Sequence, residues 1–358
     1  MKHAKLFLVV AVYSFISTAA AHADLRPANG AESAPNFAEI SLQNDLVQVK
    51  LEVDFSDLPA FVSSAAPGSD PAAELSRRIG HTFLVHADGA RLSPTTGVVE
   101  IRARKPRKTV AQPANGNRQP QKRSNQVVYA VLDYRFEGKP TEITLTPPLD
   151  KEGMPIVTIG FQTSHSGVPV TDYRYLSRAE ALRPNWDDPW YSAFDNPNLT
   201  RHHKSAIMSF LDVGPREIRH EVIFRLRDLE TWAELNLGDA ADLNATALAK
   251  IKTKAIAVFK RSNPLMIDGV MATPAGAKIE QLSISATGLN VLEETTKADR
   301  KTALFGIVLF YPQQSLPEEV EMQWTLFDNG SPPLPVLISD PKGAVPAQIT
   351  PQDPSVIW

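Results

Sequence analysis

Side chains that could hold a divalent metal ion gather between residues 187 and 203. They are two adjacent histidines and three upstream aspartates: His202, His203, Asp187, Asp188 and Asp195. Imidazole and carboxylate groups are common ligands of such ions. Adjacent side chains on an extended segment point to opposite faces, and Arg201 and Lys204 flank the histidine pair and repel a cation. A divalent-metal binding protein is therefore one alternative hypothesis, not the leading one.

A further histidine, His220, lies in a segment where apolar residues alternate with polar ones. Ile218, Val222 and Phe224 share the inward face of the predicted strand with His220. An inward imidazole is usually neutral and hydrogen-bonded, and the alternative is a pH-responsive contact with the preceding segment. Ile223 interrupts the alternation, which predicts a contact outside the strand's own core.

Residues 173–215 are rich in aromatic side chains, where a flexible linker would be polar. Trp186, Trp190 and Tyr191 are its most prominent rings. Aromatic side chains bury large apolar areas, so we expect an ordered linker that packs between two domains. The alternative is a carbohydrate-binding or carbohydrate-active protein in which these rings stack on sugars. Coplanar exposed rings would favour the sugar site, and buried rings would favour the structural linker.

A basic segment has no acidic residue between Ile101 and Leu132. Its basic residues are Arg102, Arg104, Lys105, Arg107, Lys108, Arg118, Lys122 and Arg123. Proline and glycine within the segment predict a loop. Such a loop could contact an envelope protein or an anionic surface, where each basic side chain contributes about 1 kcal/mol. A solvated loop without a partner is the alternative. Nucleic acid is not expected, because aromatic residues are not interleaved with the basic ones.

Sequence motifs of known enzymes are mostly missing. There is no Gly-x-Ser-x-Gly turn or phosphate-binding loop, and His220-Glu221 is followed by Phe224 where a metalloprotease needs a second histidine. The chain has no cysteine. A carboxylate pair from distant strands stays open, because sequence spacing cannot reveal it. The sequence favours a non-catalytic protein, and we predict no catalytic residue and no cofactor.

The elements that must position these residues occur twice. The run Val49–Leu58 recurs as His220–Leu229, each copy continues with a helical stretch, and each helical stretch leads to an Asp-Gly turn. Further strands follow in the same order. We therefore predict a mainly β protein of two tandem duplicated antiparallel β-sandwich-like domains, each with one helix inserted after the first strand. An α+β layer is the closest alternative.

Local signals define the strands and helices of each copy. Alternation in residues 49–55 places Lys50, Glu52 and Asp54 on a solvent-facing side. The first helix should begin at Asp70 as N-cap with Pro71 following, and the second at Asp242 or Asn244. Apolar stripes should face the core: Leu75, Ile79 and Phe83 in the first copy, and Leu248, Ile251, Ala255 and Phe259 in the second.

The predicted boundaries begin with an export signal. Residues 1–23 combine early lysines, an apolar run and a small-residue cleavage motif, so we expect a signal peptide, with a retained anchor as the alternative. Copy one should span 36–172, the aromatic linker 173–215 and copy two 216–358. No later stretch is apolar enough to cross a membrane. The protein is thus expected in the periplasm or cell envelope, and we expect its last residues, 354–358, to dock on copy two.

The second half resembles a group of exported bacterial two-repeat β proteins without an assigned activity. The resemblance is carried by Asn198–His202, Ser209–Leu211, Arg216–Glu221 and Leu337–Asp353. It implies no catalytic residue. The leading hypothesis is a non-catalytic exported envelope protein, a binding or assembly module that acts through its loops and the linker. Ligand, partner and oligomeric state cannot be read from the sequence.

Overall fold

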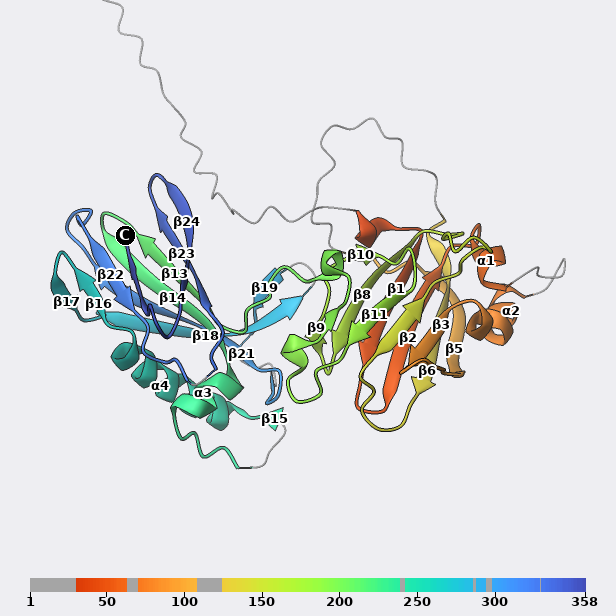
Figure 1. The fold of residues 1–358 in the computed structure, drawn as a ribbon, viewed down its shortest axis with the longest axis horizontal. Helices are drawn as coiled ribbons and strands as arrows, with labels where there is room; N and C mark the ends of the chain where they lie inside the picture. Colours follow the sequence, from red (N-terminus) through yellow and green to blue (C-terminus); the bar gives the residue numbers. More distant parts are fainter. Residues whose placement is uncertain are drawn as a thin grey trace, which may run out of the picture.

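The fold is mainly β, with strands arranged in several sheets, as the computed structural model shows (Figure 1). The structure describes residues 30–62, 70–107, 124–238, 242–285, 288–293, 298–328 and 330–358. The predicted signal peptide lies outside these ranges, as do four basic residues: Lys108, Arg118, Lys122 and Arg123. Within the described ranges, no helix has the length and apolar character needed to cross a membrane.

Two sheets form the N-terminal half, which we define as strands β1 to β12. The larger has the order β10-β8-β1-β2-β6-β5, with β9 paired to β8. Its strands are β1 (Asn36–Leu42), β2 (Leu46–Val53), β5 (Pro94–Ala103), β6 (Gln126–Arg135), β8 (Ile159–His165), β9 (Val168–Pro169) and β10 (Arg174–Tyr175). Neighbouring strands are antiparallel, except that β1 and β8 are parallel.

The smaller sheet of this half has the order β12-β11-β7-β3-β4. Its strands are β3 (Leu84–Ala87), β4 (Ala90–Arg91), β7 (Ile143–Thr146), β11 (Glu180–Arg183) and β12 (Ala193–Phe194). The helical elements are η1 (Ala31–Ser33), α1 (Leu58–Val62), α2 (Pro71–Arg78), η2 (Ile79–His81), η3 (Pro189–Tyr191) and η4 (Pro197–Leu199). Both sheets and helices α1 and α2 contribute to one hydrophobic core.

The C-terminal half, strands β13 to β25, has a seven-stranded sheet of order β19-β18-β21-β14-β13-β23-β24. Its strands are β13 (Met208–Val213), β14 (Glu217–Arg225), β18 (Gly276–Ser285), β19 (Gly288–Val291), β21 (Leu304–Pro312), β23 (Leu334–Asp340) and β24 (Gly343–Ile349). The one parallel pairing in this sheet's described strands is that of β13 with β23.

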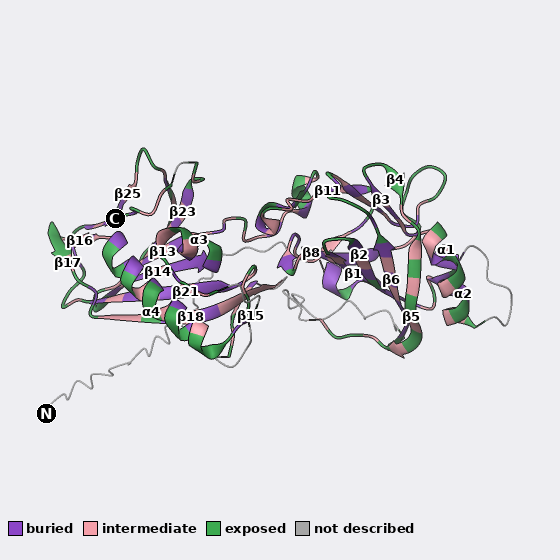
Figure 2. Ribbon diagram, turned by 90° about the horizontal axis from the view of Figure 1, so that it is seen from below, coloured by how far each residue is buried: buried purple, intermediate pink, exposed green. Residues whose placement is uncertain are grey.

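Smaller sheets and two helices complete the C-terminal half. A four-stranded sheet has the order β17-β16-β22-β25, and β15 pairs with β20. Their bounds are β15 (Asp242–Leu243), β16 (Leu265–Ile267), β17 (Val270–Ala272), β20 (Ala298–Asp299), β22 (Val320–Gln323) and β25 (Ser355–Ile357), with helices α3 (Leu226–Trp232) and α4 (Ala245–Ser262). A second core lies among these elements. Buried residues concentrate in the strands, and exposed residues follow the outer side of α4 (Figure 2).

The predicted Asp-Gly turns are confirmed in both halves. Asp88 and Gly89 have φ of 47° and 79°, and Asp268 and Gly269 have φ of 49° and 75°. A two-residue turn with positive φ at both central positions matches the twist of the strands it joins. These turns connect β3 with β4 and β16 with β17.

The predicted helix starts are also confirmed. Asp70 caps α2 by accepting a hydrogen bond from the Ala72 amide at 3.1 Å. Asn244, rather than Asp242, caps α4 and accepts from the Ala247 amide at 2.9 Å. The predicted apolar stripes are buried: Leu75, Ile79, Phe83, Leu248, Ile251, Ala255 and Phe259.

Strand pairing revises two details of the predicted layout. Strands β1 and β13 precede the strands predicted as first, so the helices follow the second strand of each half. The described residues of each half contain two α-helices instead of one, α1 and α2 in the N-terminal half and α3 and α4 in the C-terminal half. The segment 173–215 is not a separate linker along its whole length. Its strands β10, β11 and β12 pair within the N-terminal half, and β13 pairs with β14 and β23 in the other half. Sequence alternation missed β13 because its buried face includes the polar Ser209, while the apolar Met208 and Phe210 lie on the less buried face.

The last residues of the sequence dock on the C-terminal half, as expected. Strand β25 pairs with β22, and the Trp358 amide donates to the Val320 carbonyl at 2.9 Å. The Trp358 indole also donates to Asp340 Oδ2 at 3.0 Å.

Gly160 lets the backbone of η1 approach strand β8 more closely than any residue with a Cβ atom would allow. A Cβ placed there would lie 2.0 Å from the Ala31 carbonyl oxygen. We expect Gly160→Ala to lower the free energy of unfolding by about 1–3 kcal/mol, because backbone must shift. Gly97→Ala is the control, since its Cβ would meet Val131 at an ordinary 3.5 Å. Urea denaturation that shows equal stability for the two variants would contradict this reading.

Candidate functional site

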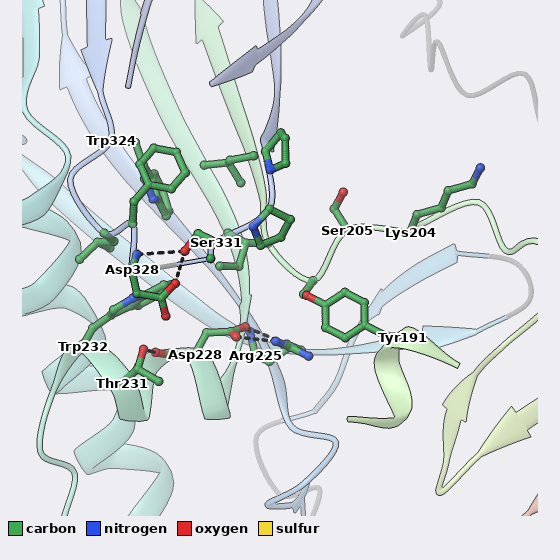
Figure 3. A pocket seen from close by; sticks show the side chains of 18 residues that line it. Tyr191, Lys204, Ser205, Arg225, Asp228, Thr231, Trp232, Trp324, Asp328 and Ser331 are labelled. Atoms are coloured by element: carbon green, nitrogen blue, oxygen red, sulfur yellow. Dashed lines mark hydrogen bonds and ion pairs between the residues drawn. The ribbon is translucent and has the colours of Figure 1, made fainter. Parts of the chain in front are cut away.

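A cavity of about 410 Å³ opens where the segment before β13 meets the C-terminal half (Figure 3). Its lining includes residues 204–207 of the segment before β13 and side chains from three further parts of the chain. Tyr191 comes from η3, Asp228 and Trp232 come from α3, and Phe327 and Asp328 come from the loop after β22. Tyr191 is 46% exposed, the largest exposed fraction among the tryptophans and tyrosines that the structure describes. We call this space the junction cavity.

Helix α3 begins where β14 ends, and its first turn fixes the floor of the junction cavity. Arg225 is the N-cap residue, and its amide donates to Asp228 Oδ2 at 3.1 Å. A carboxylate in the first turn satisfies an amide that the helix leaves unpaired and favours the helix dipole. Trp232, one turn later, packs edge-on against Phe259 and Trp324. The helix start therefore positions both the polar and the aromatic wall.

Arg225 joins the two halves through ion pairs. Its Nη1 donates to Asp188 Oδ2 at 2.6 Å, and its Nη2 and Nε donate to the two oxygens of Asp228 at 2.6 and 2.8 Å. The residue is only 8% exposed. Burial alone would lower the pKa of the Arg225 guanidinium, but the hydrogen bonds and charges of Asp228 and Asp188 outweigh burial and raise that pKa. Arg227 Nη1 adds a second contact to Asp188 Oδ2 at 3.2 Å.

A second buried arginine, Arg201, holds the segment before β13 in place. Its guanidinium donates to the carbonyl oxygens of His203, Pro169 and Trp190 at 2.6, 2.5 and 2.6 Å. It lies over the Trp190 ring, 4.5 Å from the centroid. Burial lowers the pKa of Arg201 to about 10. From the sequence, Arg201 is only a charge that repels a metal ion. Its hydrogen bonds to backbone carbonyl oxygens cannot be recognised from the spacing of side chains.

Trp190 is a packing residue between the halves, as the structural interpretation of the aromatic segment expected. It is 5% exposed and shares a small apolar cluster with Val168, Ala206, Ile223 and Leu304. Ile223 thus makes the contact outside the core of its own half that its departure from the strand alternation predicted. The Trp190 indole donates to the Lys204 carbonyl at 3.2 Å.

Trp186 faces the N-terminal half and does not line the junction cavity. It is half-buried, its indole donates to the Pro140 carbonyl at 2.8 Å, and its ring meets His165 edge-on at 4.8 Å. A sugar platform of Trp186, Trp190 and Tyr191 is therefore not formed. Of these three rings, Tyr191 alone lines the cavity.

The proposed metal ligands do not converge. Among the described residues, no group of three or more histidine, aspartate or glutamate side chains could hold a metal ion. The His202 and His203 rings lie edge-on with centroids 5.2 Å apart. Asp188 is instead bound to arginine, and Asp187 lies 3.8 Å from Lys139. Asp195 pairs with Arg183.

His220 is fully buried, as its inward position predicted. Its Nε2 lies 2.9 Å from Ser209 Oγ in β13, and burial lowers the pKa of His220 to about 4. His165 has the same character: its Nδ1 lies 2.7 Å from Ser192 Oγ, and burial lowers its pKa to about 4. Sequence reasoning missed His165, because its burial depends on Trp186 covering it.

These two imidazoles predict a loss of stability in mild acid. Unfolded histidine takes up a proton below pH 6.5, whereas the folded residues stay neutral to about pH 4. The unfolded state therefore binds more protons in this window. The free energy of unfolding should fall as pH drops from 6.5 to 4, by on the order of 3 kcal/mol per imidazole.

Urea denaturation at several pH values measures this loss. His220→Gln should flatten the slope between pH 6.5 and 4, and the exposed His81→Gln is the control. A slope unchanged by His220→Gln would contradict the assignment.

The described part of the basic segment is an internal clamp. Arg107 Nη2 and Arg102 Nη2 donate to Glu52 at 2.6 and 3.1 Å, and Arg104 Nη2 donates to Asp54 Oδ2 at 2.8 Å. The clamp is completed by Lys105, whose Nζ lies 2.8 Å from Glu39 Oε1. These four basic residues therefore have acidic partners within the protein.

The burial of these acidic partners shows that the predicted solvent-facing side of β2 was wrong at two positions. Glu52 and Asp54 were assigned to solvent, but they are 2% and 6% exposed. Glu52 lies between Phe37 on β1 and Tyr129 on β6, and each of these rings is covered by an arginine of the clamp. Period-2 alternation could not reveal this, because the cover comes from a segment about 50 residues away in the sequence.

Comparison with known proteins adds little to this geometry. No family model matches the chain, and no curated protein matches it. Among solved structures, the chain is similar to the full-length major pilin RrgB of Streptococcus pneumoniae, with 9% identity and a TM-score of 0.14. The match covers 91% of this chain and 60% of that one. A likeness this low carries no argument about fold or function.

Proposed function

We propose that this chain is a non-catalytic exported envelope protein, a binding or assembly module in which the junction cavity is the contact site. The observation that carries the proposal is the position of Tyr191. It is half-exposed at the rim of a cavity that the N-terminal segment and the C-terminal half build together. Tyrosine is enriched in recognition sites, since its ring gives contact area and its hydroxyl a hydrogen bond.

The proposal includes an internal duplication of two sandwich-like domains. The orders β8-β1-β2-β6-β5 and β23-β13-β14-β21-β18 correspond strand by strand, and each contains one parallel pair at the same position. The hairpins also correspond in detail. Asp88 Oδ1 accepts from the amides of Thr141 and Glu142, and Asp268 Oδ1 accepts from those of Glu318 and Glu319. An aspartate side chain that bonds the next strand in both halves supports a common origin.

The charges near the cavity favour binding over catalysis. Both carboxylate oxygens of Asp228 accept hydrogen bonds from Arg225, which also holds Asp188. A general base needs a carboxylate or imidazole within reach of a substrate proton. Arg225 neutralises both of these carboxylates, so they hold the two halves of the chain together instead of accepting a substrate proton.

Export and partner choice belong to the same proposal. Export to the periplasm or cell envelope rests on the sequence of residues 1–23. An envelope partner was first expected at the basic segment, but Arg102, Arg104, Lys105 and Arg107 are paired within the clamp. The other four basic residues lie outside the described residues, so a contact of the basic segment with an envelope protein or anionic surface stays a prediction, and the junction cavity is proposed from the residues that the structure describes.

Site-specific photo-crosslinking in intact cells tests the contact. A benzoylphenylalanine replaces Tyr191 in one strain and Met154 in another, because Met154 is 62% exposed and far from the cavity in sequence and fold. We expect a defined adduct in the envelope fraction from position 191 and none from position 154. The same adducts from both positions, or none from position 191, would contradict the proposal.

A further inference from the structure

We propose that the junction cavity binds a neutral hexose unit of a glycan. This inference rests on the proposed function, because it names the ligand class of the same site. It also differs from the sugar platform that the sequence allowed, since the two tryptophans of that platform lie elsewhere.

The aromatic wall offers faces of the kind that sugars stack on. Tyr191 lies on one side of the cavity (Figure 3). Trp232 comes from α3, and Phe327 comes from the loop after β22. Trp232 and Phe327 are half-buried residues of the cavity lining. Trp232 is held from behind by Phe259 and Trp324, which fixes the wall before a ligand arrives. A fixed wall reduces the entropy cost of binding.

Polar groups stand among these rings at positions suited to hydroxyls. Ser331 Oγ donates to Asp328 Oδ1, and no described residue donates to Asp328 Oδ2. Thr231 Oγ1 donates to the Asp228 carbonyl at 2.7 Å, so its oxygen can still accept a hydrogen bond. A carboxylate oxygen accepts from a sugar hydroxyl, and the threonine hydroxyl accepts from another. The cavity thus combines rings with hydroxyl-binding groups.

The charge of the cavity gives no preference for a strongly charged ligand of either sign. Its charged lining residues are Lys204, Arg225, Asp228 and Asp328, two of each sign. The buried guanidinium of Arg225 already meets two carboxylates, so it offers an anion little further attraction. The remaining lining charges, Lys204 and Asp328, are of opposite sign and balance each other. A neutral ligand is therefore favoured.

The size of the cavity fits a small part of a glycan. Small-molecule sites in proteins have volumes of about 300–1,000 Å³, and this cavity has about 410 Å³. Tyr191 in its lining is 46% exposed, so a longer chain could continue to solvent beside this ring. One hexose unit inside and its neighbour at the rim would occupy it.

Calorimetric titration of the purified chain tests the inference. The ligands are three neutral disaccharides, maltose, cellobiose and N,N′-diacetylchitobiose, together with glucose 6-phosphate as the charged comparison. We expect at least one neutral disaccharide to bind with Kd near 1 mM or below, and the phosphate at least about tenfold more weakly. No binding of any neutral disaccharide at about ten times that concentration would overturn the inference.

Variants show whether binding uses the junction cavity. Tyr191→Ala should weaken binding about tenfold, because it removes the exposed ring. Tyr175→Ala, which removes a half-buried tyrosine of β10, is the matched control and should leave Kd unchanged. Equal affinity of the wild type and Tyr191→Ala, with folding verified by circular dichroism, would also overturn the inference.

The experiments distinguish a failure of the proposed envelope contact from a failure of the proposed sugar binding. A protein adduct at position 191 without disaccharide binding would overturn the sugar and keep the contact site. Disaccharide binding that depends on Tyr191, without any adduct in cells, would support the sugar and contradict the envelope contact.

Discussion

Arg225→Ala is expected to lower the free energy of unfolding by about 3–5 kcal/mol, because it leaves Asp228 and Asp188 without their buried partner. The side chains of these carboxylates are 12% and 17% exposed, so water cannot replace the guanidinium well. The loss should exceed that of Arg225→Lys, since lysine keeps a charge but cannot bond both oxygens of Asp228. Chemical denaturation at pH 7 measures both.

Arg216→Ala provides the matched control for this prediction. Arg216 is exposed, and its Nη1 makes a long 3.4 Å hydrogen bond to the Gln314 carbonyl. Its loss should change stability by less than about 0.5 kcal/mol. If the two alanine variants were equally stable, the ion pairs of Arg225 would not hold the junction.

Glu52→Gln is the second large effect, with an expected loss of about 3–5 kcal/mol of unfolding free energy. The change keeps the shape of the side chain but removes the charge that faces Arg107, whose side chain is 6% exposed. Arg102 loses its carboxylate at the same time. The exposed Glu100→Gln is the control and should change stability by less than about 0.5 kcal/mol.

The clamp also predicts how Glu52 contributes at low pH. Burial alone would raise the pKa of the Glu52 carboxyl, but the hydrogen bond and charge of Arg107, with further bonds from Lys105 and Arg102, lower it below 4.5. Its stabilisation is therefore complete above pH 4.5 and is lost as pH falls through the lowered value. The stability difference between wild type and Glu52→Gln should shrink in that range. A difference that is constant from pH 7 to 3 would contradict the clamp.

Local features of the fold were predictable because their causes lie within a few residues. Asp70 and Asn244 cap helices that their own side chains start. The turns at Asp88-Gly89 and Asp268-Gly269 follow from the positive φ that these residue types accept. The burial of His220 follows from strand alternation.

Features that depend on distant partners were not predictable from one sequence. Glu52 looked solvent-facing until the segment near Arg107 covered it. The junction cavity combines η3, α3 and the loop after β22, which are far apart in the chain. Of the aromatic segment, Trp190 turned out to be packing and Tyr191 to be exposed, although they are neighbours. Composition alone cannot separate two adjacent rings that both lie near Arg225 but differ in burial.

The central claim is that the junction cavity is the contact site of this protein, and the crosslinking yield at Tyr191 tests it most directly. The measurement is the fraction of chain converted to a defined adduct in intact cells, at position 191 and at position 154. We predict a clear adduct at position 191 that disappears when Arg225→Ala disturbs the cavity, and none at position 154. An equal yield at both positions, or an adduct at 191 that persists unchanged in Arg225→Ala, would contradict it.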